Sequence, residues 1–153
     1  MLRDLISKIG SEYLNSKDEV WTQHPLGKYI RSEPKSIFDK VITHSRKHEL
    51  AYKGSNGERN NWAKVPWCAI FIKSITKGSS KGYYVVYLFD IEMKNVFLSL
   101  GQSSTEAGEI VKEYKNINLK DYLQAKASLM RAKIPEYSDF FSDENIDLKW
   151  ANS

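Results

Sequence analysis

Cysteine is nearly absent from this chain, and none of its apolar runs is long. The single cysteine, Cys68, lies in a short apolar stretch, so it forms no disulfide within the chain and no cysteine-based zinc cluster. We expect it to be a buried, inert thiol. No apolar run approaches the length needed to cross a bilayer, and residues 1–6 lack the apolar region of a signal peptide. We therefore expect a cytosolic protein with no membrane partner.

Several common catalytic motifs are also missing. The sequence contains no GxxxxGK(S/T) phosphate-binding loop and no GxSxG nucleophile elbow. His44 and His48 lie four residues apart, but Ser45 stands where a metalloprotease helix needs glutamate. We therefore expect no cofactor, no metal and no enzymatic activity from this chain.

The composition that is present is that of a globular protein. The chain has 153 residues, of which 41% are hydrophobic and 27% are charged, which predicts one domain with one core. The formal net charge is +4 and the pI is about 9.0, which favours an anionic partner.

Helical periodicity is clearest at the N-terminus, where apolar residues recur at helical spacing and predict a helix over residues 2–14. Residues 15–35 are polar and contain prolines, which predicts a loop or a broken segment. The pattern predicts further helices over residues 36–48 and 104–115. Residues 122–131 fit either a helix or a strand.

Strand patterns fill the middle of the chain. A short strand is predicted from residue 50, turn chemistry over residues 53–61, and a strand over residues 65–75. Residues 83–89 are β-branched and aromatic throughout, which predicts a central strand. Residues 95–100 predict its antiparallel neighbour.

The most informative stretch runs from residue 60 to residue 71 and contains Trp62, Pro66 and Trp67. Pro66 fixes the backbone directly before Trp67, which favours a rigidly held aromatic plate at the edge of a sheet. Trp62 is predicted to anchor the preceding turn to the core. Polar and cationic residues flank these aromatics and suit phosphate contact beside a stacked base. The candidates for DNA-backbone contact are Lys53, Ser55, Arg59, Asn60, Asn61 and Lys81.

Four segments occur in the order and spacing of a known family. They are Tyr52-Lys53-Gly54-Ser55, Asn61-Trp62-Ala63-Lys64-Val65-Pro66-Trp67, Gly82-Tyr83-Tyr84-Val85-Val86-Tyr87-Leu88-Phe89 and Val96-Phe97-Leu98-Ser99-Leu100-Gly101-Gln102. Over residues 37–103 the chain resembles the N-terminal DNA-recognition domain of McrB-type, modification-dependent restriction systems. The resemblance implies a small α/β (α+β) domain with a mixed, strongly bent β-sheet flanked by helices.

The resemblance also implies a function. Such domains bind double-stranded DNA carrying a modified base, usually of the 5-methylcytosine type, and flip that base into an aromatic pocket. By position in the matching motifs, the pocket residues are Trp67, Tyr84 and Leu88, with Tyr122 closing it. The best known member has an aromatic residue between glycines in the preceding turn, where this chain has Arg59, which is expected to act as a wedge or to contact a phosphate.

Under this resemblance residues 1–153 form one module at the N-terminus of a longer restriction protein. Its partner is an effector, either a nuclease or an NTPase motor, in a prokaryotic cytoplasm. Two alternatives stay open. Glu92 and Lys94 form a Glu-x-Lys pair after a predicted strand, as in metal-dependent nucleases, although no upstream aspartate suits it. The chain also fits a protein-interaction domain whose aromatics are all core.

Overall fold

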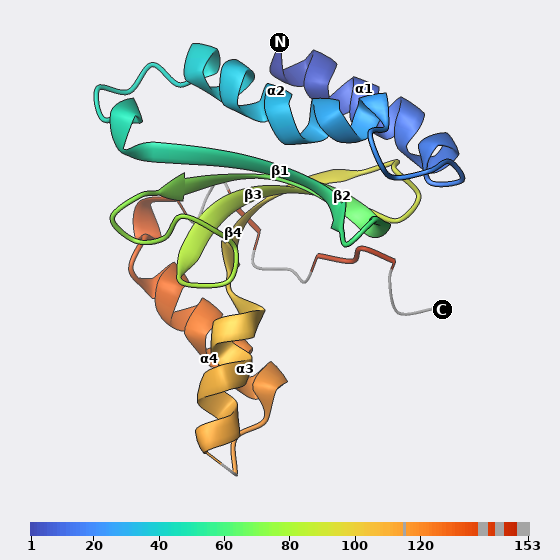
Figure 1. The fold of residues 1–153 in the computed structure, drawn as a ribbon. Helices are drawn as coiled ribbons and strands as arrows, with labels where there is room; N and C mark the ends of the chain where they lie inside the picture. The colour runs from blue at the N-terminus through green and yellow to red at the C-terminus, as the bar shows by residue number, and fades with distance from the viewer. Residues whose placement is uncertain (115, 138–140, 143–145, 150–153) are drawn as a thin grey trace.

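Two helices precede a four-stranded sheet and two follow it in this computed structural model, which describes residues 1–114, 116–137, 141–142 and 146–149. Figure 1 shows α1 and α2 above the sheet, and α3 and α4 projecting below one end of it. The elements are α1 (Leu2–Ser16), α2 (Pro25–Val41), η1 (Lys47–Glu49), β1 (Leu50–Glu58), β2 (Asn61–Ile72), β3 (Tyr83–Phe89), β4 (Val96–Gln102), α3 (Ser104–Glu113), α4 (Leu119–Ala132) and η2 (Pro135–Tyr137).

The predicted α+β class is confirmed, with one correction to the sheet. The strand order is β1-β2-β3-β4, and each strand pairs antiparallel with the next, so the sheet is not mixed. Residues 59–60, 73–82 and 90–95 join successive strands. Parallel pairing needs a crossover of a dozen or more residues, which these connections are too short to supply.

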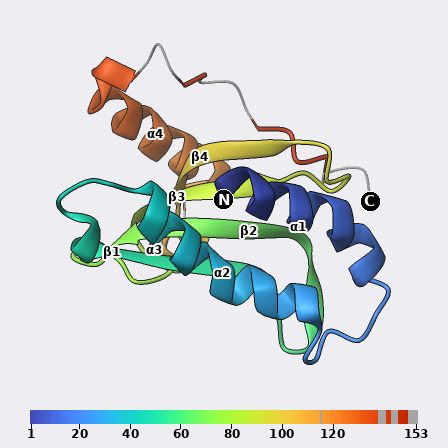
Figure 2. The ribbon, with the colours of Figure 1, turned by 90° about the horizontal axis from the view of Figure 1, so that it is seen from above.

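The main core lies between the sheet and the two N-terminal helices. Figure 2 shows α1 and α2 side by side across this face. The contact between α2 and β1 is close because Gly54 has no side chain: a Cβ there would clash with the backbone oxygen of Ile30. The buried residues of this core are Leu5, Ile9, Tyr13, Leu26, Ile30, Ile37, Phe38, Cys68 and Phe89.

The prediction for residues 15–35 was wrong over its second half, because α2 begins at Pro25 and ends at Val41 rather than near His48. Proline is favourable in the first helical turn, where its missing N–H has no intrahelical acceptor. The ring Nδ1 of His24 caps the same turn by accepting a hydrogen bond from the backbone N–H of Leu26 at 3.2 Å. Pro34 is buried inside the helix, where packing outweighs its cost.

The sheet bends where residues 63–66 of β2 lie opposite the single residue Asn56 of β1. Extra residues on one strand of a pair bend that strand and increase its twist. Pro66, which has no N–H to donate to a ladder, is buried in this bulge. The buried hydroxyl of Tyr13 donates to the backbone oxygen of Ala63 at 2.9 Å and so ties the bulge to α1. Figure 2 shows β2 turning sharply at this end.

Most of the remaining elements agree with the sequence-based predictions, and one predicted turn is shorter in the structure. The strand at residues 83–89 and the helix beginning at residue 104 are confirmed, and residues 122–131 belong to a helix, α4. The predicted turn over residues 53–61 is much shorter, because β1 continues through Glu58. The side chain of Gln102 donates to the backbone oxygen of Leu123 at 2.7 Å, which fastens α4 to the end of β4.

Candidate nucleic-acid interface

The face of the sheet opposite α1 and α2 carries three of the four predicted pocket residues. The strand register places Trp67 directly opposite Leu88, and side chains of directly paired residues lie on one face. Tyr84 shares that face because it lies four residues from Leu88 on the same strand. We call this surface the open face. Its residues are Ala51, Lys53, Ser55, Trp67, Ala69, Phe71, Tyr84, Val86, Leu88, Phe97, Ser99 and Gly101.

The open face has a small apolar floor beneath partly exposed aromatics. Phe71 is fully buried, and its ring centroid lies 5.2 Å from that of Tyr84. Trp67, Tyr84 and Leu88 are half-buried, so part of each side chain is accessible. Burial raises the pKa of the Tyr84 phenol above its ordinary value, so the hydroxyl stays neutral and able to donate at neutral pH.

Trp67 begins the straight part of β2, directly after the bulge that contains Pro66. Two polar residues of β1 lie beside it on the open face. The ammonium nitrogen of Lys53 lies 6.0 Å from the Trp67 ring centroid, and Ser55 is directly opposite Trp67 in the register. A cation over the face of an aromatic ring is attracted by the ring quadrupole. This arrangement therefore combines a stacking surface with groups suited to an anion.

Tyr122 lies in a different cluster. Its ring centroid is 5.8 Å from the ammonium nitrogen of Lys126, which is 5.0 Å from the ring centroid of Tyr83 and 3.4 Å from a carboxylate oxygen of Glu106. Tyr83 and Tyr84 are adjacent on β3, so their side chains point to opposite faces of the sheet. The described contacts thus place Tyr122 with Tyr83 rather than with Trp67.

The tip of the β1–β2 hairpin is a two-residue turn formed by Arg59 and Asn60. Both are exposed and have positive φ values, 53° and 63°, as the hairpin-favoured type I′ turn requires. Arginine is an unfavourable residue there, because a left-handed conformation costs non-glycine residues about 1–2 kcal/mol. Asn60 accepts a hydrogen bond from the Thr22 hydroxyl at 3.3 Å, and the Asn61 side chain donates to the backbone oxygen of Arg59 at 3.1 Å.

Trp62 anchors this hairpin, as predicted. Its indole N–H donates to the backbone oxygen of Glu19 at 2.9 Å. Its ring makes edge contacts with Tyr13 and His24, at centroid distances of 5.5 Å and 5.1 Å. The exposed tip is therefore held against the loop between α1 and α2.

A known protein family matches nearly the whole chain. The model of the family described as "MrcB-like, N-terminal domain" matches residues 8–153. The chain belongs to this family. The match confirms the resemblance and supports a role in DNA reading together with an effector. No curated protein and no solved structure matches the chain.

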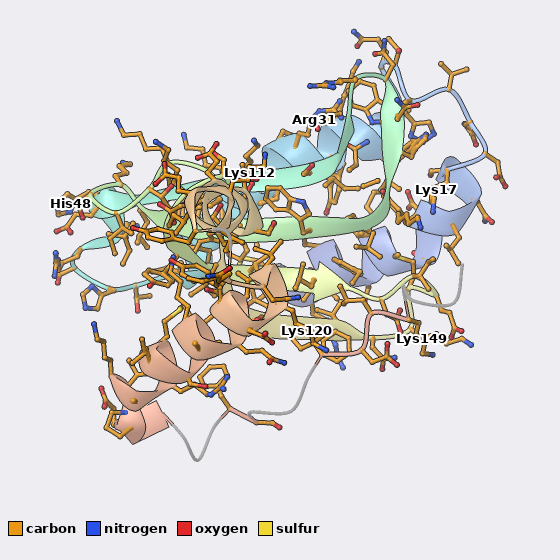
Figure 3. All side chains as sticks on the ribbon, turned by 90° about the horizontal axis from the view of Figure 1, so that it is seen from below. Lys17, Arg31, His48, Lys112, Lys120 and Lys149 are labelled. Atoms are coloured by element: carbon orange, nitrogen blue, oxygen red, sulfur yellow. The ribbon has the colours of Figure 1, made fainter. Side chains whose placement is uncertain are left out.

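In this MrcB-like domain, Lys81 lies apart from the other candidate contacts. It is exposed and precedes β3, whereas Leu88 and Trp67 lie near the other end of that strand. At about 3.3 Å per residue, the five residue steps from Tyr83 to Leu88 span roughly 17 Å. Lys81 therefore belongs to the end of the open face beside α3 and α4. Figure 3 views the molecule from the side on which α3 and α4 project, with Lys112 labelled on α3 and Lys120 labelled on α4.

The Glu-x-Lys pair of the MrcB-like domain lies in the β3–β4 connection. The carboxylate of Glu92 forms ion pairs with Lys149 at 2.8 Å and Lys94 at 3.1 Å. Hydrogen bonds from Lys149 and Lys94 lower the pKa of this exposed carboxyl. Within residues 1–114, 116–137, 141–142 and 146–149, no three His, Cys, Asp or Glu side chains are grouped to hold a metal ion. None of the helices in this part of the chain is long and apolar enough to span a membrane.

Proposed function

We propose that this domain reads double-stranded DNA carrying a modified base of the 5-methylcytosine type. The modified base flips out of the duplex and stacks on Trp67, with Leu88 and Tyr84 forming the neighbouring walls. The domain thereby directs a restriction effector, a nuclease or an NTPase motor, to modified DNA in a prokaryotic cytoplasm. In this proposal the chain itself is not an enzyme, and residues 1–153 are the N-terminal module of a longer protein.

One observation carries the proposal: a tryptophan held behind a proline bulge lies on an open sheet face, directly opposite Leu88 and beneath the ammonium of Lys53. A core tryptophan needs no such cation. An aromatic plate beside a cation and a hydroxyl suits a flipped nucleotide, which presents a flat base and an anionic phosphate.

The remaining candidates have assigned roles in the proposal. Arg59, at the exposed tip of the anchored hairpin, enters the gap that the flipped base leaves or contacts a phosphate beside it. Lys53, Ser55, Asn60 and Asn61 contact the backbone near the flipped nucleotide, and Lys81 contacts it at the α3–α4 end. Closure of the pocket by Tyr122 stays a prediction, which requires its ring to leave the Lys126 cluster.

Typical free energies show how much the aromatic wall of the pocket contributes to binding. Extruding a base costs a few kcal/mol, and stacking on an aromatic side chain returns about 1–3 kcal/mol per base. Burying one extra methyl group adds about 0.8 kcal/mol, which is less than tenfold in affinity. Discrimination therefore also needs polar groups matched to the base edge, or several copies acting on one DNA.

A binding panel tests the proposal. Duplexes of one sequence context would carry cytosine, 5-methylcytosine, 5-hydroxymethylcytosine, N4-methylcytosine or N6-methyladenine, and affinities would be measured by mobility shift. We expect the duplex carrying 5-methylcytosine or 5-hydroxymethylcytosine to bind more tightly than the unmodified one. Trp67→Ala should weaken that binding roughly five- to 150-fold, the equivalent of about 1–3 kcal/mol of stacking.

The matched control is Tyr114→Ala, which removes an aromatic ring that is 57% exposed just after α3. It should leave the affinity within twofold. Circular dichroism and a thermal melt would show that both variants fold. Equal affinity for all five duplexes would refute the proposal, as would an unfolded Trp67→Ala variant, because that result assigns Trp67 to the core.

A further inference from the structure

The two edges of the sheet differ in how they are protected from pairing with another chain. The outer strand β1 carries Lys53, two glycines and the irregular register opposite the bulge. These features discourage addition of another strand. The other outer strand, β4, reads Val-Phe-Leu-Ser-Leu-Gly-Gln and has no charged residue and no proline. In the described residues it pairs with β3 and with no second strand.

The unprotected strand also exposes apolar side chains. Leu98 is 41% exposed and Leu100 is 44% exposed, and neighbouring Val85 on β3 is 36% exposed. Val85 and Leu100 are directly paired and therefore lie on one face, which Leu98 shares because it is two residues from Leu100. This is the face that α1 and α2 cover elsewhere, because Tyr87, two residues from Val85 on β3, packs against the core beneath those helices. Figure 2 shows β4 at the edge of the sheet, beyond α1. An uncharged edge with exposed leucines is a template for an additional strand.

We propose that β4 pairs antiparallel with β4 of a second copy of this chain, centred on Ser99. The four strands of each copy then form one continuous sheet of eight. No charged residue lies between positions 96 and 102, so self-pairing brings no like charges into opposition. The occupant of this edge is thus the same strand, related by a two-fold axis.

The sequence of β4 is complementary to itself in this register. Leu98 of one copy lies opposite Leu100 of the other, so four leucines cover one another on one face. On the open face, Phe97 lies opposite Gly101, a pairing in which an aromatic ring covers a strand glycine. The Tyr84 ring already packs over Gly101 from β3, since a Cβ on Gly101 would meet a Tyr84 ring carbon at 2.8 Å. Phe97 of the second copy would extend this aromatic cluster.

Self-pairing has a consequence for DNA reading, which rests on the proposed function. In an antiparallel pair within one sheet, the two-fold axis is perpendicular to the sheet, so both open faces lie on the same side. The two Trp67 residues are then five strand spacings of about 4.8 Å apart across the sheet and four residues of about 3.3 Å apart along the strands, because each is level with Phe97, so they are separated by roughly 27 Å. One duplex could contact both, and a doubly modified site would gain avidity without new contacts.

Sedimentation equilibrium of the free protein, over a concentration series, tests the interface without DNA. We expect a monomer–dimer equilibrium in the wild type. Leu98→Lys should raise the dimer dissociation constant about tenfold or more, because it places a charge in the leucine cluster. The matched control Leu129→Lys alters a leucine on α4 that is 65% exposed and should change the constant less than twofold.

Mixing variants tests the register. Leu98→Lys and Leu100→Glu place opposite charges directly across the interface, so their mixture should form heterodimers more tightly than either variant forms homodimers. Leu98→Lys mixed with Leu98→Glu should gain less, because those positions are not directly opposed. A wild type that stays monomeric throughout the series, or equal effects of Leu98→Lys and Leu129→Lys, would overturn the proposal.

The reading function and the pairing of β4 strands can be refuted independently of each other. Trp67→Ala removes the proposed stacking surface and should leave the dimer constant unchanged, while Leu98→Lys should leave binding to a singly modified duplex unchanged. Loss of selectivity for modified DNA in a dimeric protein would refute the reading function alone.

Discussion

Arg59 illustrates how one residue can work against local stability. It occupies the first central position of a type I′ turn at φ 53°, where asparagine, aspartate and glycine are the favoured residues. Strain of this kind persists where the surrounding structure holds it, and it is often associated with function. Trp62 and Thr22 supply that support here, since both fasten the hairpin to the loop between α1 and α2.

We predict that Arg59→Asn stabilises the domain and weakens DNA binding. Asparagine tolerates the left-handed conformation, so the free energy of unfolding should rise by about 0.5–1 kcal/mol. Urea denaturation measures this gain. Arg59→Lys is the matched control, because it keeps the charge and the strain; its stability should equal that of the wild type. A less stable Arg59→Asn variant would contradict the assignment of strain.

Asp90 gives a pH dependence with a defined direction. It is fully buried after β3, and its carboxylate accepts hydrogen bonds from the backbone of Lys94 at 2.8 Å and the side chain of Asn95 at 2.7 Å. Burial alone would raise its pKa, but these hydrogen bonds outweigh it, so the pKa is lowered. A lowered pKa in the folded state contributes stability above the unfolded value, near 3.9.

We therefore predict that the contribution of Asp90 is complete at neutral pH. It should be lost as the pH falls below about 4 and through the lowered pKa of the folded state. Urea denaturation from pH 7 to acid would show this loss. Asp90→Asn should be less stable at pH 7 by about 1–3 kcal/mol, and should show a shallower decline in acid. Parallel pH profiles for both proteins would exclude the role of Asp90.

At the scale of helices and strands, local sequence predicted some elements correctly and others only in part. Strand β3 was predicted with its bounds because β-branched and aromatic residues dominate it. Helix α2 was missed in part because Pro25 and Pro34 are locally helix-breaking, whereas Pro25 starts the helix and Pro34 is buried by packing. Trp67, Tyr84 and Leu88 were grouped by the family resemblance, and the strand register places them on one face of the sheet. Tyr122 was assigned to the same pocket by the same resemblance, but its described contacts are with the Lys126 cluster beside Tyr83, because the position of α4 depends on contacts with residues distant in sequence, such as Gln102.

We predict opposite effects on stability for alanine at two glycines, Gly54 in β1 and Gly108 in α3. Gly54→Ala should prevent native packing, because the added Cβ would collide with the backbone oxygen of Ile30, which cannot rotate away. The matched control is Gly108→Ala in α3, where a Cβ would meet nothing within 4 Å. That change should stabilise the domain by about 0.5–1 kcal/mol, since alanine favours helices. Thermal melts of the two variants should therefore shift in opposite directions, and a stable Gly54→Ala variant would contradict the close contact.

At the scale of the whole molecule, the sheet separates stability from recognition. The helix-covered face holds the larger core, while the opposite face carries half-buried aromatics and polar side chains above a small cluster formed by Ala69, Phe71 and Val86. Substitutions at accessible atoms of the open face should therefore affect binding more than folding. The net charge of +4 adds a general attraction to DNA, which carries no preference for a modified base.

This separation predicts how salt dependence and selectivity respond to Lys53. Phosphate contacts release counterions, so the logarithm of affinity falls linearly with the logarithm of salt concentration. Lys53→Met keeps an extended apolar side chain beside Trp67 but removes the charge. If Lys53 contacts a phosphate, the variant should bind modified and unmodified duplexes more weakly by similar factors, and its salt slope should decrease by about 1.

Lys28→Met is the matched control for the loss of one charge, because Lys28 is exposed on α2, on the opposite side of the sheet. Its salt slope should equal that of the wild type. Titrations of both duplexes at several salt concentrations separate the roles of Lys53 and Trp67: Lys53→Met should keep the ratio of the two affinities, whereas Trp67→Ala should reduce it. A Lys53→Met variant that loses the ratio and keeps the slope would instead place this ammonium on the flipped base, because a group that reads the base affects selectivity without releasing a backbone counterion.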